Sequence, residues 1–410
     1  MNKLVKKERL DWMDWGFILL MTVVGLAIRL QLRTVTTVDW TMYWDPWLAT
    51  LKEQGFAALA TDFYDYAPPF VYILWVISRL PVNPMTAFKG LMIVVDFIAA
   101  IVMGKIVWEG TGSRVKSICT YGLFLVVPTI WANSALWAQC DIIFMTFVML
   151  CIYELFRDKP GRAMFFYGIA FAFKLQSLFI FPFLVILWVN KKIRLQHFLW
   201  IPVMYFVGIL PAWIAGRPLS ELIAIYAAQG AQDVWSLSIK WPNIYQIIGN
   251  QFFLLEYAEA GTFLILGILM CVMFWMAQRK YKVTKEFIIQ LALFFAILCP
   301  YVLPHMHERY GCLADILAII YAIMNRKRFF VPIVQITMSF NSYMAYLSHL
   351  GADEPPMYYG VWAFIELGLL VIIGLDLYRY FADPRNRAEA QQAPVAKEQK
   401  NLAKRRKQYG

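Results

Sequence analysis

The sequence predicts an all-α polytopic membrane protein with about 12 transmembrane helices, and three observations support this. Hydrophobic residues make up 60% of the 410-residue chain. Charged residues make up only 16%, against about 25% in soluble domains. The mean hydropathy is +0.56, and no polar stretch is long enough to form a sizeable soluble domain.

Apolar runs alternate with short polar segments, and a helix needs about 20 apolar residues to cross a bilayer. The run 163–190 has basic residues at both ends, so a single crossing would place one basic loop outside. We therefore predict two short helices that turn at Lys174-Leu175-Gln176. The twelve predicted crossings lie at residues 15–32, 86–107, 116–132, 139–155, 163–175, 177–190, 197–215, 261–278, 286–303, 311–325, 329–347 and 358–378.

The distribution of lysine and arginine predicts the orientation. On this topology 29 of the 38 basic residues lie in segments placed on the cytoplasmic side, and seven lie outside. Such an asymmetry places both termini in the cytoplasm of a multi-pass plasma membrane protein. The net charge of +11 could suggest nucleic acid, but the basic residues occur in short runs between apolar segments, so we predict no nucleic-acid partner.

Residues 1–378 therefore form a single transmembrane domain, and the basic tail 379–410 is predicted to be cytoplasmic and disordered or bound to anionic lipid. Two outer segments are long, 33–85 and 216–260. Within the first, residues 69–80 are apolar but short and follow a proline, so we predict an interfacial helix. Any chemistry must then occur at the outer mouth of the helices.

The chain is organised around residues 303–310, which place His305, His307, Glu308 and Arg309 between two apolar runs. Charge is costly at membrane depth and usually marks a working site. The alternative is that these residues only anchor a helix end at the headgroup level. Three ionisable residues within four positions exceed what an anchor needs, so we favour a functional site.

Two aspartates in the first outer loop are candidates for the same site. Asp39 follows the first crossing closely and precedes no clear helix signal, so a functional role is favoured. Asp45 lies before Pro46 and could instead cap a short helix.

Further polar residues are predicted at this mouth. Gln139 and Asp141 open the fourth crossing, where Asp141 either contacts substrate or complements the helix dipole. Lys174 and Gln176 lie at the turn between two half-length helices. Broken helices at membrane depth are tolerated where they line a cavity, which favours function for Lys174 over simple solvation.

A carboxylate facing cations and imidazoles suits transfer of a sugar from a phosphate leaving group. The carboxylate can take the proton of an acceptor hydroxyl, and Lys174 or Arg309 can offset charge on the departing phosphate. Aromatic residues such as Tyr43 and Tyr66 can stack on a sugar or a prenyl chain. No glycine-rich phosphate loop occurs, which favours a lipid-linked donor met from outside. No cofactor is predicted; two aspartates could hold a divalent metal through water, but no ligand spacing argues for one.

Four stretches carry a resemblance to the GT-C superfamily of polytopic glycosyltransferases, in particular to bacterial relatives of the GPI mannosyltransferases. Each stretch is weak alone, but the four occur in the family's order over most of residues 39–315. They are Asp39-Trp40-Thr41-Met42-Tyr43-Trp44-Asp45-Pro46-Trp47 with 55–59, Tyr64-Asp65-Tyr66-Ala67-Pro68-Pro69-Phe70-Val71-Tyr72, residues 133–141 with Lys174-Leu175-Gln176 and Pro182, and Met306-His307-Glu308-Arg309-Tyr310 with Ala314-Asp315.

The resemblance implies a GT-C-type bundle and an inverting transferase. Its donor would be a polyprenyl-phosphate-linked sugar, with a mannose-like hexose as the family-level choice, and its acceptor a glycan or lipid. The resemblance maps the base to Asp39. Trp40 stands where Tyr is more usual, which keeps Asp45 a rival. Ala138 stands where similar sequences have Gly, which is tolerable unless the backbone must take a positive φ.

By the same assignment, Lys174, Arg309, His305 and His307 would contact the donor phosphate. A second set would shape the substrate pocket: Gln139, Asp141, Gln176, Glu308, Tyr43 and Tyr66.

Two other classes of protein remain open. A transporter or flippase of lipid-linked sugars would also use broken helices and an embedded lysine. Such proteins commonly show two repeated halves, whereas this sequence shows no internal repeat and gathers its charges at one face. A ligase or polymerase of preassembled glycans would share the outer site and differ in whether the donor carries one sugar or many.

Overall fold

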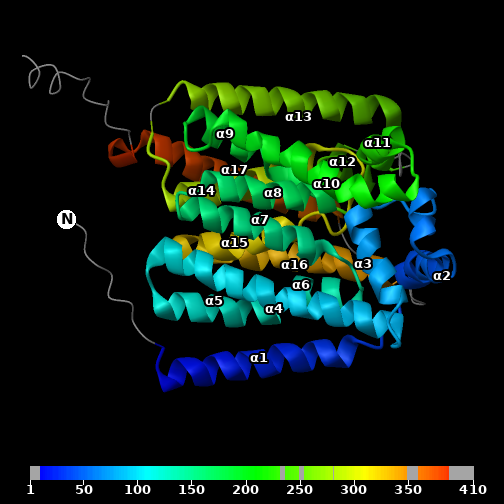
Figure 1. Ribbon diagram of the computed structural model, residues 1–410. Helices are drawn as coiled ribbons and strands as arrows, with labels where there is room; N and C mark the ends of the chain where they lie inside the picture. The colour runs from blue at the N-terminus through cyan, green and yellow to red at the C-terminus, as the bar shows by residue number, and fades with distance from the viewer. Residues whose placement is uncertain (1–9, 231–235, 249–253, 280, 349–358, 387–410) are drawn as a thin grey trace, which may run out of the picture.

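A computed structural model describes residues 10–230, 236–248, 254–279, 281–348 and 359–386. These residues form a helical bundle whose long helices run side by side (Figure 1). The helices α1 (Trp12–Leu32), α4 (Pro84–Thr111), α13 (Leu254–Ala277), α14 (Lys285–Val302) and α17 (Tyr359–Ala382) are long and apolar. Together with residues 195–215, which contain α10 (Trp200–Ala215), they make six candidate membrane spans in the described chain.

The remaining predicted crossings are shorter helices or are broken. A seventh candidate span is bent by 48° where α5 (Arg114–Val126) gives way to α6 (Pro128–Trp131) and the π-helix η3 (Ala132–Leu136). The others are too short or not apolar enough to count as unbroken spans, although a helix occupies each segment. They are α7 (Asp141–Phe156), α8 (Pro160–Phe173), η4 (Leu175–Ile180) with α9 (Phe181–Val189), α15 (Cys312–Met324) and α16 (Phe330–Leu347).

The predicted turn at Lys174 is present. Helix α8 ends at Phe173, Lys174 is extended with φ −155° and ψ 133°, and the 3-10 helix η4 follows. Asp158, before α8, forms an ion pair with Lys192, after α9, at 2.5 Å. Because the two flanking loops meet, the chain must reverse direction between them.

Ion pairs also join the predicted cytoplasmic loops to one another at one end of the bundle. Arg114 contacts Asp14 at 3.0 Å, so the loop after α4 meets the start of α1. Lys285, at the start of α14, lies 3.6 Å from Glu109 near the end of α4. The start of α1 and the end of α17 lie at this end in Figure 1, on the left of the view.

The opposite end carries the first long loop. It contains the π-helix η1 (Trp40–Trp44), α2 (Asp45–Gln54), the 3-10 helix η2 (Gly55–Ala60) and α3 (Pro68–Ser78). Helix α11 (Leu219–Gly230) lies at the same end (Figure 1). The short helix α12 (Tyr245–Ile248) and a two-stranded parallel sheet of β1 (Ser238–Ile239) and β2 (Met306–His307) complete the loop structure. Elsewhere the described residues contain the short 3-10 helices η5 (Leu195–Leu199), η6 (Arg326–Arg328) and η8 (Pro384–Asn386).

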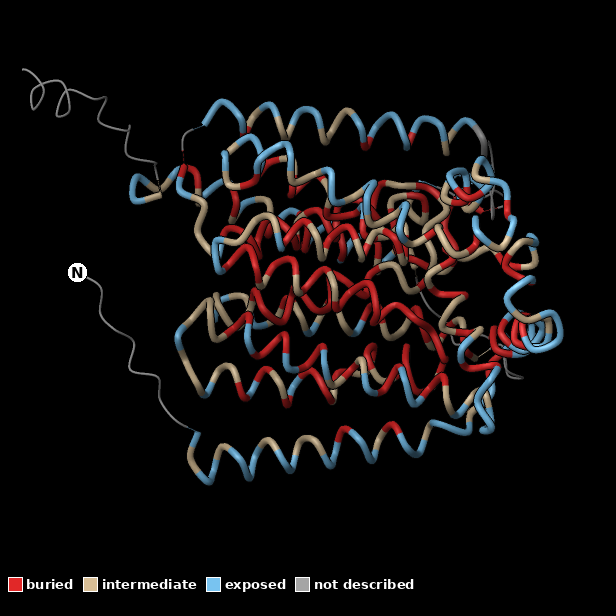
Figure 2. The backbone as a smooth tube through the Cα atoms, viewed as in Figure 1, coloured by how far each residue is buried: buried red, intermediate tan, exposed pale blue. Residues whose placement is uncertain are grey.

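The burial pattern separates the centre of the bundle from its flanks. Helices α7, α14 and α15 are buried along most of their length, whereas α1 and α13 have few buried residues among those described (Figure 2). Phe263 and Phe274 of α13 are 72% and 67% exposed. An apolar face of this kind on an outer helix suits contact with lipid.

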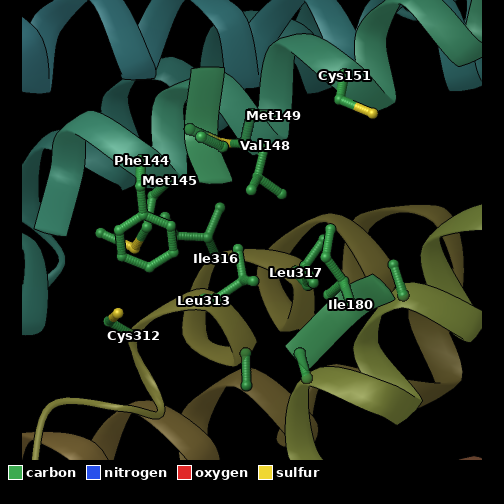
Figure 3. Close-up of a cluster of buried hydrophobic side chains, with 14 of the residues drawn as sticks. Phe144, Met145, Val148, Met149, Cys151, Ile180, Cys312, Leu313, Ile316 and Leu317 are labelled. Carbon is green, nitrogen blue, oxygen red and sulfur yellow. The ribbon is translucent and has the colours of Figure 1, made fainter. Parts of the chain in front are cut away.

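Part of the core lies between α7, α15 and the broken helix η4. Phe144, Met145 and Val148 of α7 lie opposite Leu313 and Ile316 of α15 (Figure 3). Ile180 of η4 is drawn in the same cluster, so the broken helix packs into the core just beyond Lys174. This packing fixes the helix ends that carry Asp141 and Lys174.

Candidate functional site

Polar residues from four distant parts of the chain meet at the end of the bundle opposite the start of α1 and the end of α17 (Figure 1). They come from the start of η1, the segment between η3 and α7, the turn at Lys174, and the turn between α14 and α15. Each segment is a break between helices, where backbone and side chains are free to face a common space. The resulting network can be followed from Asp39 to Lys174.

Asp39 is buried, with 5% of its surface exposed, and three donors hold its carboxylate. Oδ2 accepts hydrogen bonds from Trp137 Nε1 at 2.9 Å and from Gln139 Nε2 at 2.6 Å. Oδ1 accepts one from the hydroxyl of Tyr346 at 2.5 Å. These three hydrogen bonds fix the position of the Asp39 carboxylate.

Asp141 forms a second centre at the first residue of α7. Its Oδ1 pairs with Lys174 Nζ, and its Oδ2 accepts a hydrogen bond from Asn133 Nδ2 at 2.8 Å. Arg309 Nε lies 3.7 Å from the same Oδ2. A carboxylate at a helix N-terminus is also favoured by the helix dipole. One carboxylate therefore fixes two cations that the sequence places 135 positions apart.

Tyr66 links the two centres. Its hydroxyl lies 3.5 Å from Gln139 Oε1 and 3.4 Å from Arg309 Nη2. Lys174 Nζ lies 5.5 Å from the centre of the Tyr66 ring, within the range of a cation–π contact. The contacts thus run from Asp39 through Gln139 and Tyr66 to both cations.

The turn between α14 and α15 is fixed by the second long loop. His305 N donates to the carbonyl of Leu237 at 2.9 Å, and β1 pairs with β2 beside it. His305 takes a positive φ of 59°, which directs the chain into this pairing. Sequence reasoning missed the pairing, because two-residue strands carry no periodic signal.

Glu308 and Arg309 turn toward the protein interior. Glu308 is fully buried and its Oε1 lies 3.1 Å from Arg309 Nη1. Burial acts to raise the pKa of the Glu308 carboxyl, but the contacts with His307 and the charge of Arg309 outweigh it. The pKa of Glu308 consequently lies below its ordinary value of 4.5.

A cavity of about 890 Å³ opens beside this network. This volume lies within the range of about 300–1,000 Å³ for small-molecule sites. Its polar end is lined by Tyr66, Lys174, Gln176, His305 and His307. Gln176 Oε1 is buried and has no hydrogen-bond partner among the described residues, so a ligand donor could satisfy it.

The other walls of this cavity are apolar. Leu178, Phe181 and Pro182 line it from the broken helix, and Phe263 and Leu266 line it from α13. Because Phe263 is also exposed on the outer surface of α13, the apolar part adjoins the outer face of the bundle. One space therefore joins a cationic, hydrogen-bonding end to a hydrophobic channel.

The predicted residues divide into three groups. Asp39, Gln139, Asp141, Glu308 and Arg309 belong to the network but are not among the residues that line this cavity. Tyr66, Lys174, Gln176, His305 and His307 line it. Tyr43 and Asp45 lie outside the network, and both are exposed. Asp45 lies in the first turn of α2, followed by Pro46, which suits helix capping.

The structure adds three residues that sequence reasoning did not single out. Trp137 and Asn133 lie within a motif that the sequence already marks, so their donor groups could have been considered. Tyr346 lies in the last turn of α16, 307 positions from Asp39, and no local pattern marks it.

Ala138 adopts a positive φ of 63°. This is the condition under which its methyl group becomes unfavourable, because only glycine takes such a conformation without strain. The carbonyl of Ala138 accepts a hydrogen bond from Trp44 Nε1 at 3.1 Å, which helps to hold the turn.

No family model and no curated protein matches this chain. Among the described residues, no group of three or more His, Cys, Asp or Glu side chains is placed to hold a metal ion. The chemistry of the site is therefore argued from its own residues.

Proposed function

We propose that the protein is an inverting membrane glycosyltransferase that uses a polyprenyl-phosphate-linked sugar as donor. The observation that supports this most is the cavity of about 890 Å³, which joins Lys174, His305 and His307 to an apolar channel beside α13. A lipid phosphate needs both features in one space, since its headgroup is anionic and its chain is apolar. A soluble nucleotide-sugar would have no use for the channel.

The donor phosphate would lie against Lys174, with His305 and His307 as further hydrogen-bond partners. Lys174 is held by Asp141, so its ammonium group is already placed at the cavity wall. Arg309 adds positive charge behind it, within contact of Asp141 and Tyr66. As the bond between the sugar and the phosphate breaks, these groups would offset the charge that gathers on the phosphate.

Transfer would proceed by one displacement. The acceptor hydroxyl oxygen attacks the anomeric carbon, the bond to the phosphate oxygen breaks, and the polyprenyl phosphate departs. Asp39 is the proposed base that takes the hydroxyl proton, with Asp45 as the rival that the sequence leaves open. The acceptor would be a glycan or a lipid, and mannose is the first sugar to test.

The proposed setting is the plasma membrane, with 12 crossings, both termini in the cytoplasm and the site facing outward. The excess of basic residues at the end that holds the α1 start supports this orientation. In this orientation α2 and α3 lie at the outer interface, next to the lipid headgroup region from which the donor must enter the site.

Reconstituted protein tests the proposal. Vesicles would receive a radiolabelled polyprenyl-phosphate hexose and a panel of glycan and lipid acceptors, and product would be identified by mass spectrometry. We expect Asp39→Asn to lower the transfer rate by about 10²–10⁴-fold, the range for a general base. Asp45→Asn tests the rival base, and it should keep the wild-type rate if Asp39 takes the proton. Full activity of Asp39→Asn would remove Asp39 from the mechanism.

A transporter of lipid-linked sugars is the second candidate, and one observation favours it. Asp315 and Glu366 are fully buried in α15 and α17, and neither oxygen of Glu366 has a hydrogen-bond partner among the described residues. Buried carboxyl groups of this kind are common in transport pathways. Movement of labelled lipid between leaflets, without any glycosidic product, would support this function instead.

A further inference from the structure

A second cavity, of about 320 Å³, lies at the same end of the bundle as the first. It is formed between the first long loop and α11, both of which lie at the right of Figure 1. The residues that matter here are Tyr43, Trp47, Asp62, Asp65, Arg217 and Gln229. Of these residues, only Tyr43 was predicted above to contact substrate.

The lining combines aromatic faces with charged groups. The rings of Tyr43 and Trp47 lie 6.3 Å apart at an angle of 68°. Tyr43 is 46% exposed, and Asp62 is exposed as well. Aromatic faces pack against the C–H faces of sugar rings, whereas carboxylates accept hydrogen bonds from sugar hydroxyls.

Arg217 supplies an unsatisfied donor. It is 6% exposed, and its guanidinium lies 4.5 Å from the centre of the Tyr64 ring. Nε lies 3.4 Å from Glu221, but Nη1 is buried without a hydrogen-bond partner among the described residues. A buried donor without a partner is costly, so a ligand oxygen in this cavity would be favoured.

The two cavities share part of their walls. Asp65 and Gln229 line both of them. The side-chain amide of Gln229 donates to the backbone carbonyl of Asp65, which joins α11 to the first loop at this point. A ligand in one cavity is therefore separated from a ligand in the other by these two residues.

We infer that the second cavity binds the carbohydrate acceptor, and that Asp65, which lines both cavities, replaces Asp39 as the carboxylate that takes the proton from the reacting hydroxyl. The inference rests on the proposed function, because it assigns the first cavity to the donor. The acceptor oxygen forms a bond to the anomeric carbon, the sugar–phosphate bond breaks, the proton passes to Asp65, and the phosphate leaves with its lipid.

This assignment gives Asp39 another role. Asp39 is not among the residues that line either cavity, and its oxygens already accept hydrogen bonds from Trp137, Gln139 and Tyr346. It would act as a positioning residue that fixes Gln139 and, through it, Tyr66. Asp65 and Asp39 are then competing candidates for the base, and kinetics separate them.

The first experiment measures sugar binding without any donor. Purified protein would be titrated with mono- and disaccharides, methyl α-mannoside and mannobiose among them, by saturation-transfer NMR. We expect saturable binding that Tyr43→Ala and Asp62→Asn weaken about tenfold. Lys174→Met, which alters only the first cavity, should leave this binding unchanged. Tyr43→Phe is the matched control and should bind as the wild type does.

The second experiment follows transfer. Asp62→Asn should raise the acceptor KM about tenfold with little change in kcat or in the donor KM. Asp65→Asn should lower kcat by about 10²-fold or more, the range for a general base, and remove the acidic limb of the pH–rate profile. Asp39→Asn should instead lower kcat while that limb persists.

The outcomes are distinct. If no sugar binds, or if binding is unaffected by Tyr43→Ala and Asp62→Asn, the second cavity is not an acceptor site. If sugar binds there but no polyprenyl-phosphate sugar serves as donor, the proposed function fails and the binding site stands. If Asp65→Asn retains full kcat, Asp65 is not the base.

Discussion

Two buried ion pairs in this protein differ in what surrounds them. Arg29 of α1 and Asp96 of α4 pair at 2.7 Å, and both side chains are completely inaccessible. Lys174 and Asp141 also pair, with 8% and 2% of their side chains exposed. The first pair lies among helices, whereas Lys174 lines a cavity.

The partners of the two pairs show what the difference means. Arg29 Nη1 donates to the carbonyls of Gly25 and Leu125, and Asp96 also accepts from Ser134 of η3. These bonds all stay within the protein and join α1 to the bundle. Lys174 instead presents its charge beside an open space. We therefore assign the first pair to structure and the second to ligand binding.

The largest expected effect comes from breaking the structural pair. Arg29→Met leaves the Asp96 carboxylate buried without its cation, which costs about 3–5 kcal/mol. Thermal unfolding of the detergent-solubilised protein would measure the loss. The double variant with Asp96→Leu should recover most of it, because replacing a whole buried pair with apolar groups is often nearly neutral. A single variant as stable as the wild type would show that the pair does not hold α1.

Breaking the pair of Lys174 and Asp141 should affect activity more than stability. Lys174→Met should lower kcat/KM for a polyprenyl-phosphate sugar by about 10²–10³-fold, the typical loss of a charge-stabilising group. The matched comparison is Arg29→Met, measured below its own unfolding temperature, which should keep most of the wild-type turnover. Equal losses of turnover in Lys174→Met and Arg29→Met would contradict the assignment of one pair to ligand binding and the other to structure.

A smaller effect concerns pH. The pKa of Glu308 is depressed below 4.5, so its stabilising contribution is present above that pH and is lost as the pH falls through its lower folded value. Glu308→Gln should therefore lower the unfolding temperature by a similar amount from pH 8 to pH 5. Below pH 4.5 the difference between the two proteins should shrink. A difference that grows on acidification would contradict the depressed pKa.

The smallest effect is expected at Ala138. Ala138→Gly removes the strain of a positive φ but also removes a buried methyl group and adds freedom to the unfolded chain. We expect a net stabilisation below about 1 kcal/mol, read as a small rise in unfolding temperature. Ala138→Val is the opposing control and should destabilise clearly, because a branched side chain is strained further in this conformation.

Much of the fold could be predicted from charge and hydropathy. The reversal at Lys174 was predictable because Lys and Arg at both ends of the run 163–190 exclude a single crossing. The number of membrane spans was harder to predict from the sequence. Helices such as α15, with 13 residues, are buried by neighbouring helices, so length and hydropathy alone do not decide whether they span.

The site could be predicted in part from the topology. Asp39, Gln139, Lys174 and Arg309 lie at helix ends on one side of the predicted topology, and the structure brings them into one network. Tyr346 could not be predicted, since its contact with Asp39 depends on how α16 packs. The cavities depend equally on tertiary packing, which explains why Asp65 gave no signal beyond its place in a motif.

The central claim is that one cavity binds a lipid phosphate at Lys174. A structure of the protein with bound polyprenyl phosphate tests it most directly. The account predicts the phosphate within ion-pair distance of Lys174, beside His305 or His307, with the isoprenoid chain between α9 and α13. A phosphate bound at the other end of the bundle, or a lipid that avoids this cavity, would contradict it.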